Sequence, residues 1–314
     1  MKTAVLAGLV AYIVYVLRQQ HFDWTLVQQQ LRSVRHPERW ALGLVLLTPL
    51  NWGFEALKWQ ILLQRVEPTT FRAAYRGVLA GLSLGFALPA QLGDTAGRVL
   101  SLRTSARAEA IGASLVSGGM QFYVALVFGT VAWLHYLAVV PERNNTAGQW
   151  LLALLVVLSL LGVVFGLVRQ RLIGWLSTRP RLHRFARYWA VGGQYDGREI
   201  GRGLVVAALR YLVFSLQFYV AMRLVGVALP PDAAASGIGV VFLVKTITPA
   251  FNLLSDLGVR EAAALWVFAP FDQTAGTVPA PVLITVTLTL WLVNILIPVL
   301  IGLLLVWRLT WSVR

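Results

Sequence analysis

Apolar segments alternate with short polar stretches along the whole chain. Because about 20 apolar residues span a bilayer as an α-helix, the 314 residues leave room for about seven to ten segments that cross or dip into a membrane. The run 3–17 is followed by Arg18 and glutamines without a small-residue cleavage site, which indicates a retained first helix rather than a signal peptide. The pattern predicts helices at about 3–17, 40–63, 73–90, 93–102, 109–137, 150–168, 202–227, 233–253, 257–270 and 280–307.

The composition favours the same class of protein. Hydrophobic residues make up 58% of the chain and charged residues only 13%, which is far from the balance of a soluble domain. The absence of cysteine excludes disulfides, thiolate metal sites and thiol nucleophiles. The histidines lack metal-ligand spacing; they are His21, His36, His135 and His183. We therefore expect neither a metal nor a cofactor.

The formal net charge of +14 comes from arginines in short stretches between apolar runs, not from a soluble basic domain. This distribution favours membrane topology and contact with anionic lipid headgroups over nucleic-acid binding. The positive-inside rule places the arginine-rich linker 169–202 and the C-terminus on the cytoplasmic side of a cell (inner) membrane. It places the loops near 138–149 and 271–280 on the outer side. Counting the membrane crossings back from this linker puts 18–39 outside although that stretch carries arginines, so the orientation of the first two helices stays open.

The aromatic residues of the linker 169–202 alternate with its arginines. Such a mixture is typical of a helix that lies in the membrane interface, where it anchors the topology. The residues are Trp175, Phe185, Tyr188 and Trp189.

A weak internal repeat appears when the chain is shifted by 160 residues. Ala73, Ala74, Gly77, Pro89 and Ala90 then fall on Ala233, Ala234, Gly237, Pro249 and Ala250. After a two-residue slip, the motif Asp-x-x-x-Arg occurs in both halves, as Asp94 to Arg98 and as Asp256 to Arg260. Since aspartates are few in this chain, the match of proline and acid-base pair is more informative than the small residues.

The repeat and the loop charges together predict an all-α, polytopic integral membrane bundle with two inverted repeats, at about 40–137 and 202–307. Each repeat would contain a broken or re-entrant helical hairpin. The hairpin 73–102 would enter from the inside and 233–270 from the outside, related by a pseudo-two-fold axis in the membrane plane.

The repeated motif suggests a site for an anionic headgroup. Pro89 and Pro249 should break the helix, and the new helix that starts at Asp94 or Asp256 would present unpaired N–H groups to an anion. Arg98 and Arg260 lie one turn later on the same face and could grip a phosphate or carboxylate. In the alternative interpretation each aspartate caps its helix and neutralises its arginine.

A second polar group lies inside the apolar run 40–63, where Asn51, Glu55 and Lys58 share a helical face. A Glu–Lys pair facing lipid would be costly, so it should face the bundle interior or a wet cavity. Alternatively, Lys58 snorkels to the inner interface and Glu55 follows it.

Other polar residues at membrane depth need partners. Lys245 has no ion-pair partner nearby in the sequence, and Glu261, next to Arg260, is its most plausible partner. We expect interhelical hydrogen bonds, rather than ligand contacts, from Arg210, Gln217, Gln121 and Asn294. No nucleotide loop, Ser-His-Asp arrangement or acidic metal cluster is visible, which disfavours an enzyme.

The chain resembles the lysylphosphatidylglycerol synthase transmembrane family, also called flippase-like domain proteins. The resemblance rests on 51–63 with its Lys58-Trp59, on 89–98 and on 257–262. In the multiple peptide resistance factor, a similar domain is taken to translocate aminoacylated phosphatidylglycerol, while a separate domain transfers the aminoacyl group. The 314 residues contain no such transferase domain. Other members are linked to glycolipids, polyprenyl-linked sugars or hopanoids.

The resemblance implies translocation of an anionic, aminoacylated or glycosylated/polyprenyl lipid. The alternative is an accessory subunit or enzyme of envelope lipid synthesis. Membrane lipids with anionic headgroups are the expected partners; the lipid itself, the direction of transport, the energy source and the oligomeric state stay open.

Overall fold

The computed structural model describes residues 34–87, 90–179, 186–248, 253–275 and 278–308, together with Thr25, Gln29 and Arg32. Every regular element in these ranges is a helix. The predicted first helix 3–17 lies outside the described residues, as do Pro89 and Pro249 with the helix breaks expected at them.

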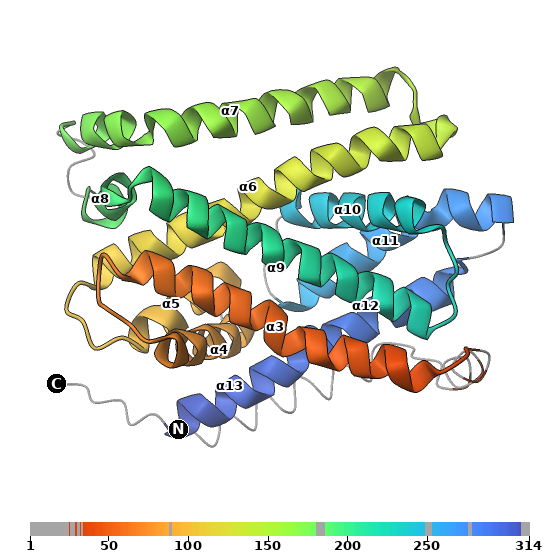
Figure 1. The fold of residues 1–314 in the computed structure, drawn as a ribbon, viewed down its shortest axis with the longest axis horizontal. Coiled ribbons are helices and arrows are strands. Elements are labelled where there is room, and N and C mark those ends of the chain that lie inside the picture. The colour runs from red at the N-terminus through yellow and green to blue at the C-terminus, as the bar shows by residue number, and fades with distance from the viewer. Residues whose placement is uncertain are drawn as a thin grey trace.

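The structure describes four helices between residues 34 and 139 (Figure 1), which are α3 (Pro37–Leu63), α4 (Phe71–Ala87), α5 (Ala90–Leu100) and α6 (Arg107–Val139). Proline at the first position and Glu38 in the first turn favour the start of α3, because the ring fixes the backbone angle and the carboxylate complements the helix dipole. These helices match the predicted segments to within a few residues.

The stretch predicted as a basic linker, 169–202, is largely helical. It holds the end of α7 (Thr146–Ser177), then α8 (Ala186–Gln194) and the start of α9 (Gly197–Leu224). A short 3-10 helix, η1 (Pro141–Arg143), precedes α7. Asp196 caps α9 in a reciprocal capping box with Glu199. The apolar pattern did not predict these helical bounds, because arginines and other polar residues interrupt the pattern in this stretch.

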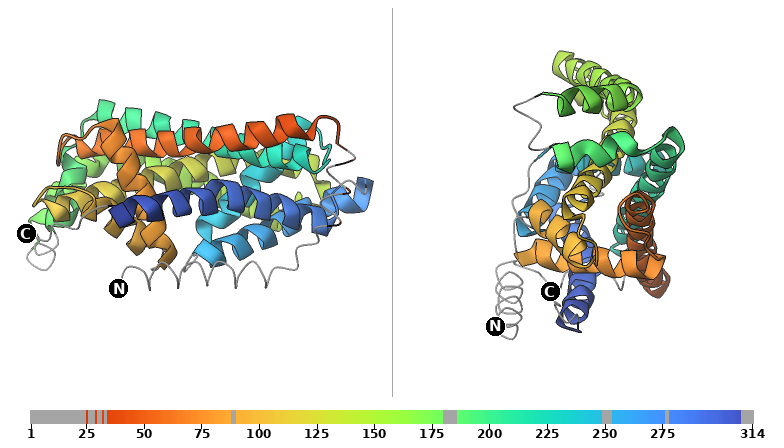
Figure 2. Two further views of the ribbon diagram at one scale, coloured as in Figure 1. Left: turned by 90° about the horizontal axis from the view of Figure 1, so that it is seen from below. Right: turned by 90° about the vertical axis from the view of Figure 1, so that its left-hand side faces the viewer.

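The last third contains α10 (Pro231–Ile247), α11 (Leu253–Ala275), α12 (Ala280–Trp291), the π-helical turn η3 (Leu292–Leu296) and α13 (Ile297–Arg308). Helices α4 and α10 each have 17 residues, and their first residues, 71 and 231, differ by the 160 positions of the sequence repeat. The pairs α4–α5 and α10–α11 lie toward opposite halves of the long axis of the molecule (Figures 1 and 2).

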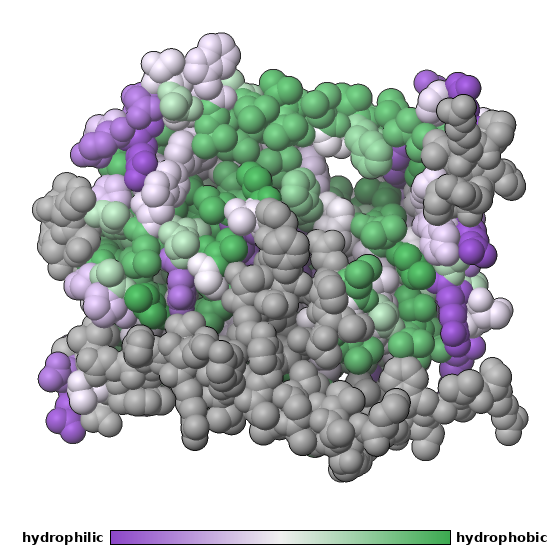
Figure 3. Space-filling model, turned by 180° about the vertical axis from the view of Figure 1, so that it is seen from behind, coloured by the Kyte–Doolittle hydropathy of each residue, from purple (hydrophilic) through white to green (hydrophobic). Residues whose placement is uncertain are grey.

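The long helices run roughly along one axis of the molecule (Figure 2). Within the described ranges, four are long and apolar enough to cross a membrane, namely α6, α7, α9 and the run 280–305. The view from behind shows apolar side chains across the middle and hydrophilic side chains gathered at the two ends (Figure 3). Helix α7 exposes most of its apolar side chains, as a helix surrounded by lipid would. The protein is a multi-pass, membrane-embedded helical bundle.

The predicted inner ends of the helices meet at one end of the molecule. Arg65, just after α3, donates from Nε to Glu199 Oε1 at 2.8 Å and from Nη2 to Glu199 Oε2 at 3.0 Å, which ties the α3–α4 loop to the start of α9. Arg107 and Arg187 line one pocket between the starts of α6 and α8. Arg65, Arg107 and Arg187, which belong to three arginine-rich stretches of the chain, therefore lie at a common end of the molecule.

Helices α4 and α5 approach each other so closely that their backbones touch. A Cβ on Gly97 would lie 2.5 Å from Gly81 Cα and 2.6 Å from Ala80 O, which leaves no room for any side chain. Small residues allow such contacts between helices in membranes. This contact fixes α5 against α4 and so fixes the position of Arg98, the residue that follows Gly97.

Candidate functional site

Helix α3 buries a carboxylate and an ammonium in the middle of the bundle. Glu55 is 3% exposed and Lys58 1% exposed, and Lys58 Nζ lies 2.8 Å from Glu55 Oε2. Their spacing of three residues places them on one helical face. The prediction that this pair faces the bundle interior is confirmed, and the snorkelling alternative for Lys58 is wrong because its ammonium is enclosed by protein.

Glu55 is the centre of a cluster built from four helices, called here the Glu55 cluster (Asp94, Arg98, Glu55, Lys58, Arg210 and Gln121). Arg98 Nη1 on α5 donates to Glu55 Oε1 at 2.8 Å, and Arg210 Nη1 on α9 lies 2.9 Å from Glu55 Oε2. Lys58 and Arg210 also both donate to the side-chain oxygen of Gln121 on α6, at 3.3 Å each.

Every nitrogen of the Arg98 guanidinium has a carboxylate partner. Nε donates to Asp94 Oδ1 at 3.0 Å, Nη2 lies 2.9 Å from Asp94 Oδ2, and Nη1 bonds to Glu55. The indole of Trp59 lies under the guanidinium, with 5.5 Å between Cζ and the ring centroid. The predicted pairing of Asp94 with Arg98 is confirmed, and no nitrogen of Arg98 is without a carboxylate partner.

Arg210 and Gln121 belong to this cluster, although the sequence favoured them only as interhelical contacts. The indole of Trp52 supports Arg210, with 5.0 Å from Cζ to the ring centroid, and donates from Nε1 to Asn294 O at 2.9 Å. Asn294 lies in the π-helical turn η3, where a widened helix frees backbone carbonyls for such contacts. Asn51 reaches the same residue, donating from Nδ2 to Asn294 Oδ1 at 3.1 Å, and so braces the cluster without a charge contact.

A second, smaller group of charges lies where α10 meets α11, called here the Arg260 cluster (Lys245, Asp256 and Arg260). Arg260 is 1% exposed and donates from Nη2 to Asp256 Oδ2 at 2.7 Å. This confirms the second predicted Asp–Arg pair. Lys245 Nζ lies 3.0 Å from Asp256 Oδ1, so Asp256 bridges both cations.

The predicted partner of Lys245, Glu261, is wrong. On a helix, residues 256 and 261 point about 140° apart, because each residue advances the direction by about 100°. Asp256 therefore faces α10, where Lys245 lies, and Glu261 does not. Glu261 is partly buried, and its Oε1 has no hydrogen-bond partner in the structure.

The two clusters meet along a single stripe of α9. Arg210 enters the Glu55 cluster, and Phe214, one turn further along, lies under Arg260 with 5.3 Å from Cζ to the ring centroid. Four residues advance a helix by about 6 Å. Charged groups from both halves of the chain thus contact neighbouring turns of α9.

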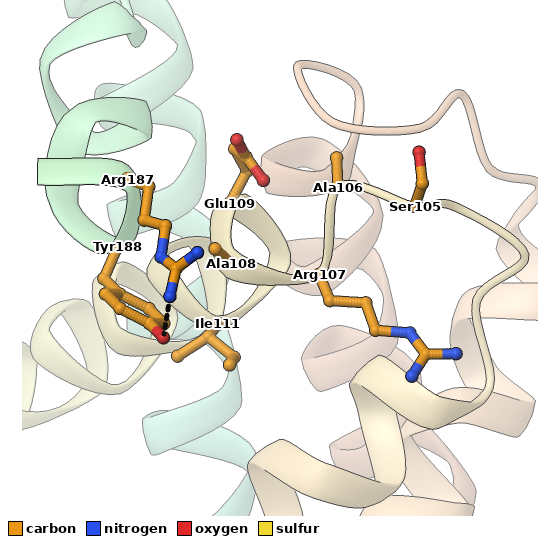
Figure 4. A pocket seen from close by; sticks show the side chains of 8 residues that line it. All are labelled: Ser105, Ala106, Arg107, Ala108, Glu109, Ile111, Arg187 and Tyr188. Carbon is orange, nitrogen blue, oxygen red and sulfur yellow. Dashed lines mark hydrogen bonds between the residues drawn. The ribbon is translucent and has the colours of Figure 1, made fainter. Parts of the chain in front are cut away.

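An open pocket of about 570 Å³ lies elsewhere, at the arginine-rich end of the molecule (Figure 4). Its walls include Arg107, Glu109, Arg187 and Tyr188, and Arg187 Nη2 donates to the Tyr188 hydroxyl at 3.2 Å. Gln121 of the Glu55 cluster lies 14 residues further along α6, or about 21 Å. The pocket is therefore separate from the buried charges, which carry the greater electrostatic cost and the more specific geometry. In the ranges that the structure describes, no three His, Cys, Asp or Glu side chains gather as metal ligands would.

Comparison with known proteins identifies the family of this chain. No curated protein matches it. The family model described as the lysylphosphatidylglycerol synthase TM region matches residues 2–309, nearly the whole chain, in agreement with the resemblance seen in the sequence motifs. The protein belongs to the lysylphosphatidylglycerol synthase transmembrane region family, a family of membrane domains tied to lipid handling.

Proposed function

We propose that this protein is a flippase-like transporter that moves lipids with an anionic headgroup across the bilayer. The observation that carries the proposal is the burial of two clusters of charge inside an apolar bundle, the Glu55 cluster from α3, α5 and α9 and the Arg260 cluster from α10 and α11. A lipid headgroup needs compensating charges to cross hydrocarbon. Ionisable residues inside a membrane protein are energetically costly, and they usually mark a functional site.

The sign of the excess charge favours an anionic headgroup. The Glu55 cluster contains three cations, Lys58, Arg98 and Arg210, against the two carboxylates of Glu55 and Asp94. The Arg260 cluster contains two cations against the carboxylate of Asp256. Each cluster thus has one cation more than it has carboxylates, so the interior attracts a phosphate or carboxylate and repels an ammonium.

The two helical pairs α4–α5 and α10–α11 supply the moving parts in this proposal. They would enter the membrane from opposite faces as inverted repeats, with the arginine-rich end of the molecule in the cytoplasm. Their equal first helices and the 160-residue offset support this arrangement. An inverted pair gives two nearly equivalent conformations, one open to each side, which is the basis of alternating access.

The experiment that tests the function is reconstitution of the purified protein into liposomes that contain a fluorescent anionic phospholipid. Transport is measured as the fraction of label that a membrane-impermeant quencher reaches, relative to protein-free liposomes. Mass spectrometry of the recovered lipid separates the alternative, an enzyme of envelope lipid synthesis, because an enzyme would change the mass of the lipid and a transporter would not. An unchanged distribution with an unchanged lipid would contradict the proposed transport.

A further inference from the structure

The two buried arginines of the repeated motif differ in how their donors are used. All three nitrogens of Arg98 have carboxylate partners within 3.0 Å. Arg260 uses Nη2 for Asp256, whereas its Nε and Nη1 have no hydrogen-bond partner, although the side chain is only 1% exposed. The sequence motif is the same in both halves, but only the second arginine has nitrogens without any hydrogen-bond partner.

Unsatisfied donors of a buried guanidinium are unusual and call for an explanation. A buried N–H that has lost water and found no acceptor is unfavourable, more so on a charged group. The ring of Phe214 faces the guanidinium and stabilises its charge, but a ring face does not replace acceptors in the plane of the N–H groups. Glu261, the neighbouring carboxylate, forms no ion pair with Arg260, and its Oε1 is itself unpartnered.

We infer that Arg260 binds the phosphate oxyanion of the lipid directly, and that the Glu55 cluster positions the helices without touching the headgroup. This inference rests on the proposed function and divides its roles between the two clusters. Nη1 has no partner, and Nη2 donates only one of its two N–H groups to Asp256. These two nitrogens form the end of the planar fork, which suits an acceptor with several oxygens such as a phosphate. Asp256 holds the guanidinium in place from the Nη2 side.

Lys245 marks the side from which the oxyanion arrives. Its side chain is 32% exposed, the most accessible of the three residues in the Arg260 cluster, and it shares Asp256 with Arg260. A phosphate that reaches Lys245 first can pass to the buried guanidinium, since both cations are held by the same carboxylate. Because α10 and α11 meet at this ion pair, binding would be coupled to the movement of one helix against the other.

A binding measurement that does not depend on transport tests the inference. The full chain in a non-ionic detergent is titrated by calorimetry with soluble dihexanoyl phosphatidylglycerol, with dihexanoylglycerol as the phosphate-free control, and with inorganic phosphate. The variants are Arg260→Gln, Arg260→Lys and Arg98→Gln. Arg223→Gln is the matched control, because Arg223 also lies over an aromatic ring, the indole of Trp40, but belongs to neither cluster.

We expect the wild type and Arg223→Gln to bind the phospholipid and not dihexanoylglycerol. Arg260→Gln should weaken binding at least about tenfold, and Arg260→Lys should restore only part of it, because an ammonium lacks the planar fork. Arg98→Gln should reduce the folded yield but leave the affinity of folded protein within about threefold, since removing a group without a direct contact has a smaller effect. If Arg260→Gln fails to fold, Lys245→Gln replaces it, with a loss of about threefold or more expected for a partly exposed cation.

Three results would overturn the inference: no binding of any probe by the wild type, equal loss in Arg98→Gln and Arg260→Gln, or full affinity in Arg260→Gln or in the Lys245→Gln variant that replaces it. Tight binding of inorganic phosphate would support the oxyanion site but overturn a lipid as its source. Binding that depends on Arg260 together with failed transport in liposomes would support the site and contradict the proposed function, so the two can fail separately.

Discussion

Arg98 Nη1 and Glu55 Oε1 lie 2.8 Å apart although 43 positions separate the two residues in the chain. This bond joins α5, the second member of the first helical pair, to α3. It also makes Glu55 the shared partner of Arg98, Lys58 and Arg210. A single buried carboxylate thus holds cations from three helices, so its removal should affect all of them together.

The substitution Glu55→Gln should lower the stability of the fold by about 3–5 kcal/mol, the usual consequence of leaving buried charges without a partner. It would leave three cations against Asp94 alone. The measurement is unfolding in mixed micelles as the fraction of denaturing detergent rises, with exposed Glu38→Gln as the control. Equal unfolding curves for both variants would show that the cluster does not stabilise the bundle.

The substitution Gly97→Ala should disrupt the pair α4–α5, because the new Cβ would meet the backbone of Gly81 and Ala80. The melting temperature should fall. Gly118→Ala on α6 is the matched control, since no atom lies within 4 Å of the position of its new Cβ. Alanine favours a helix over glycine by about 1 kcal/mol, so this control should be unchanged or slightly more stable. A Gly97→Ala protein as stable as the control would contradict the close backbone contact.

Asp196→Asn should weaken the start of α9 and change its response to acid. The pKa of Asp196 lies below its ordinary value, chiefly because the backbone N–H of Glu199 donates to its carboxylate. A lowered pKa in the folded state means that the carboxylate stabilises the fold above its unfolded pKa and loses this effect as the pH falls through the folded pKa. Wild type and variant should therefore differ in melting temperature near neutral pH and converge in acid. A difference that grows in acid would contradict this role.

The chain contains no cysteine, so single-cysteine variants can report topology without further changes. Thr70→Cys, before α4, and Ala228→Cys, before α10, occupy exposed positions at the bases of the two helical pairs. If the pairs enter from opposite faces, an impermeant maleimide added to sealed vesicles should label Ala228→Cys but not Thr70→Cys, and inside-out vesicles should reverse the result. Labelling of both from the same side would rule out inverted entry.

Local contacts of the site followed from the sequence because helical geometry alone determines them. The pairs Glu55–Lys58, Asp94–Arg98 and Asp256–Arg260 are separated by three or four residues, so their contact needs only a helix. Equally, the long apolar runs were enough to predict the approximate bounds of most of the helices that the structure describes.

Contacts between distant segments did not follow in the same way. Arg210 reaches Glu55 only because α9 packs along α3, and no local pattern encodes that packing. The partner of Lys245 was misassigned for the same reason, since the order of residues does not say which face of α11 meets α10. The unequal use of donors in Arg98 and Arg260 is likewise visible only in three dimensions, because both arginines stand in the same Asp-x-x-x-Arg pattern.

Transport per folded molecule is the measurement that tests the central claim most directly. Wild type, Arg260→Gln and Arg223→Gln are reconstituted at equal amounts of monodisperse protein, and the rate at which a fluorescent anionic phospholipid crosses is compared. We expect wild type and Arg223→Gln to move the lipid at similar rates without altering its mass. Arg260→Gln should lose at least about tenfold in rate, because a charge-assisted contact to the phosphate is gone. Equal rates for all three folded proteins, or no rate above protein-free liposomes for the wild type, would contradict transport through the buried charges.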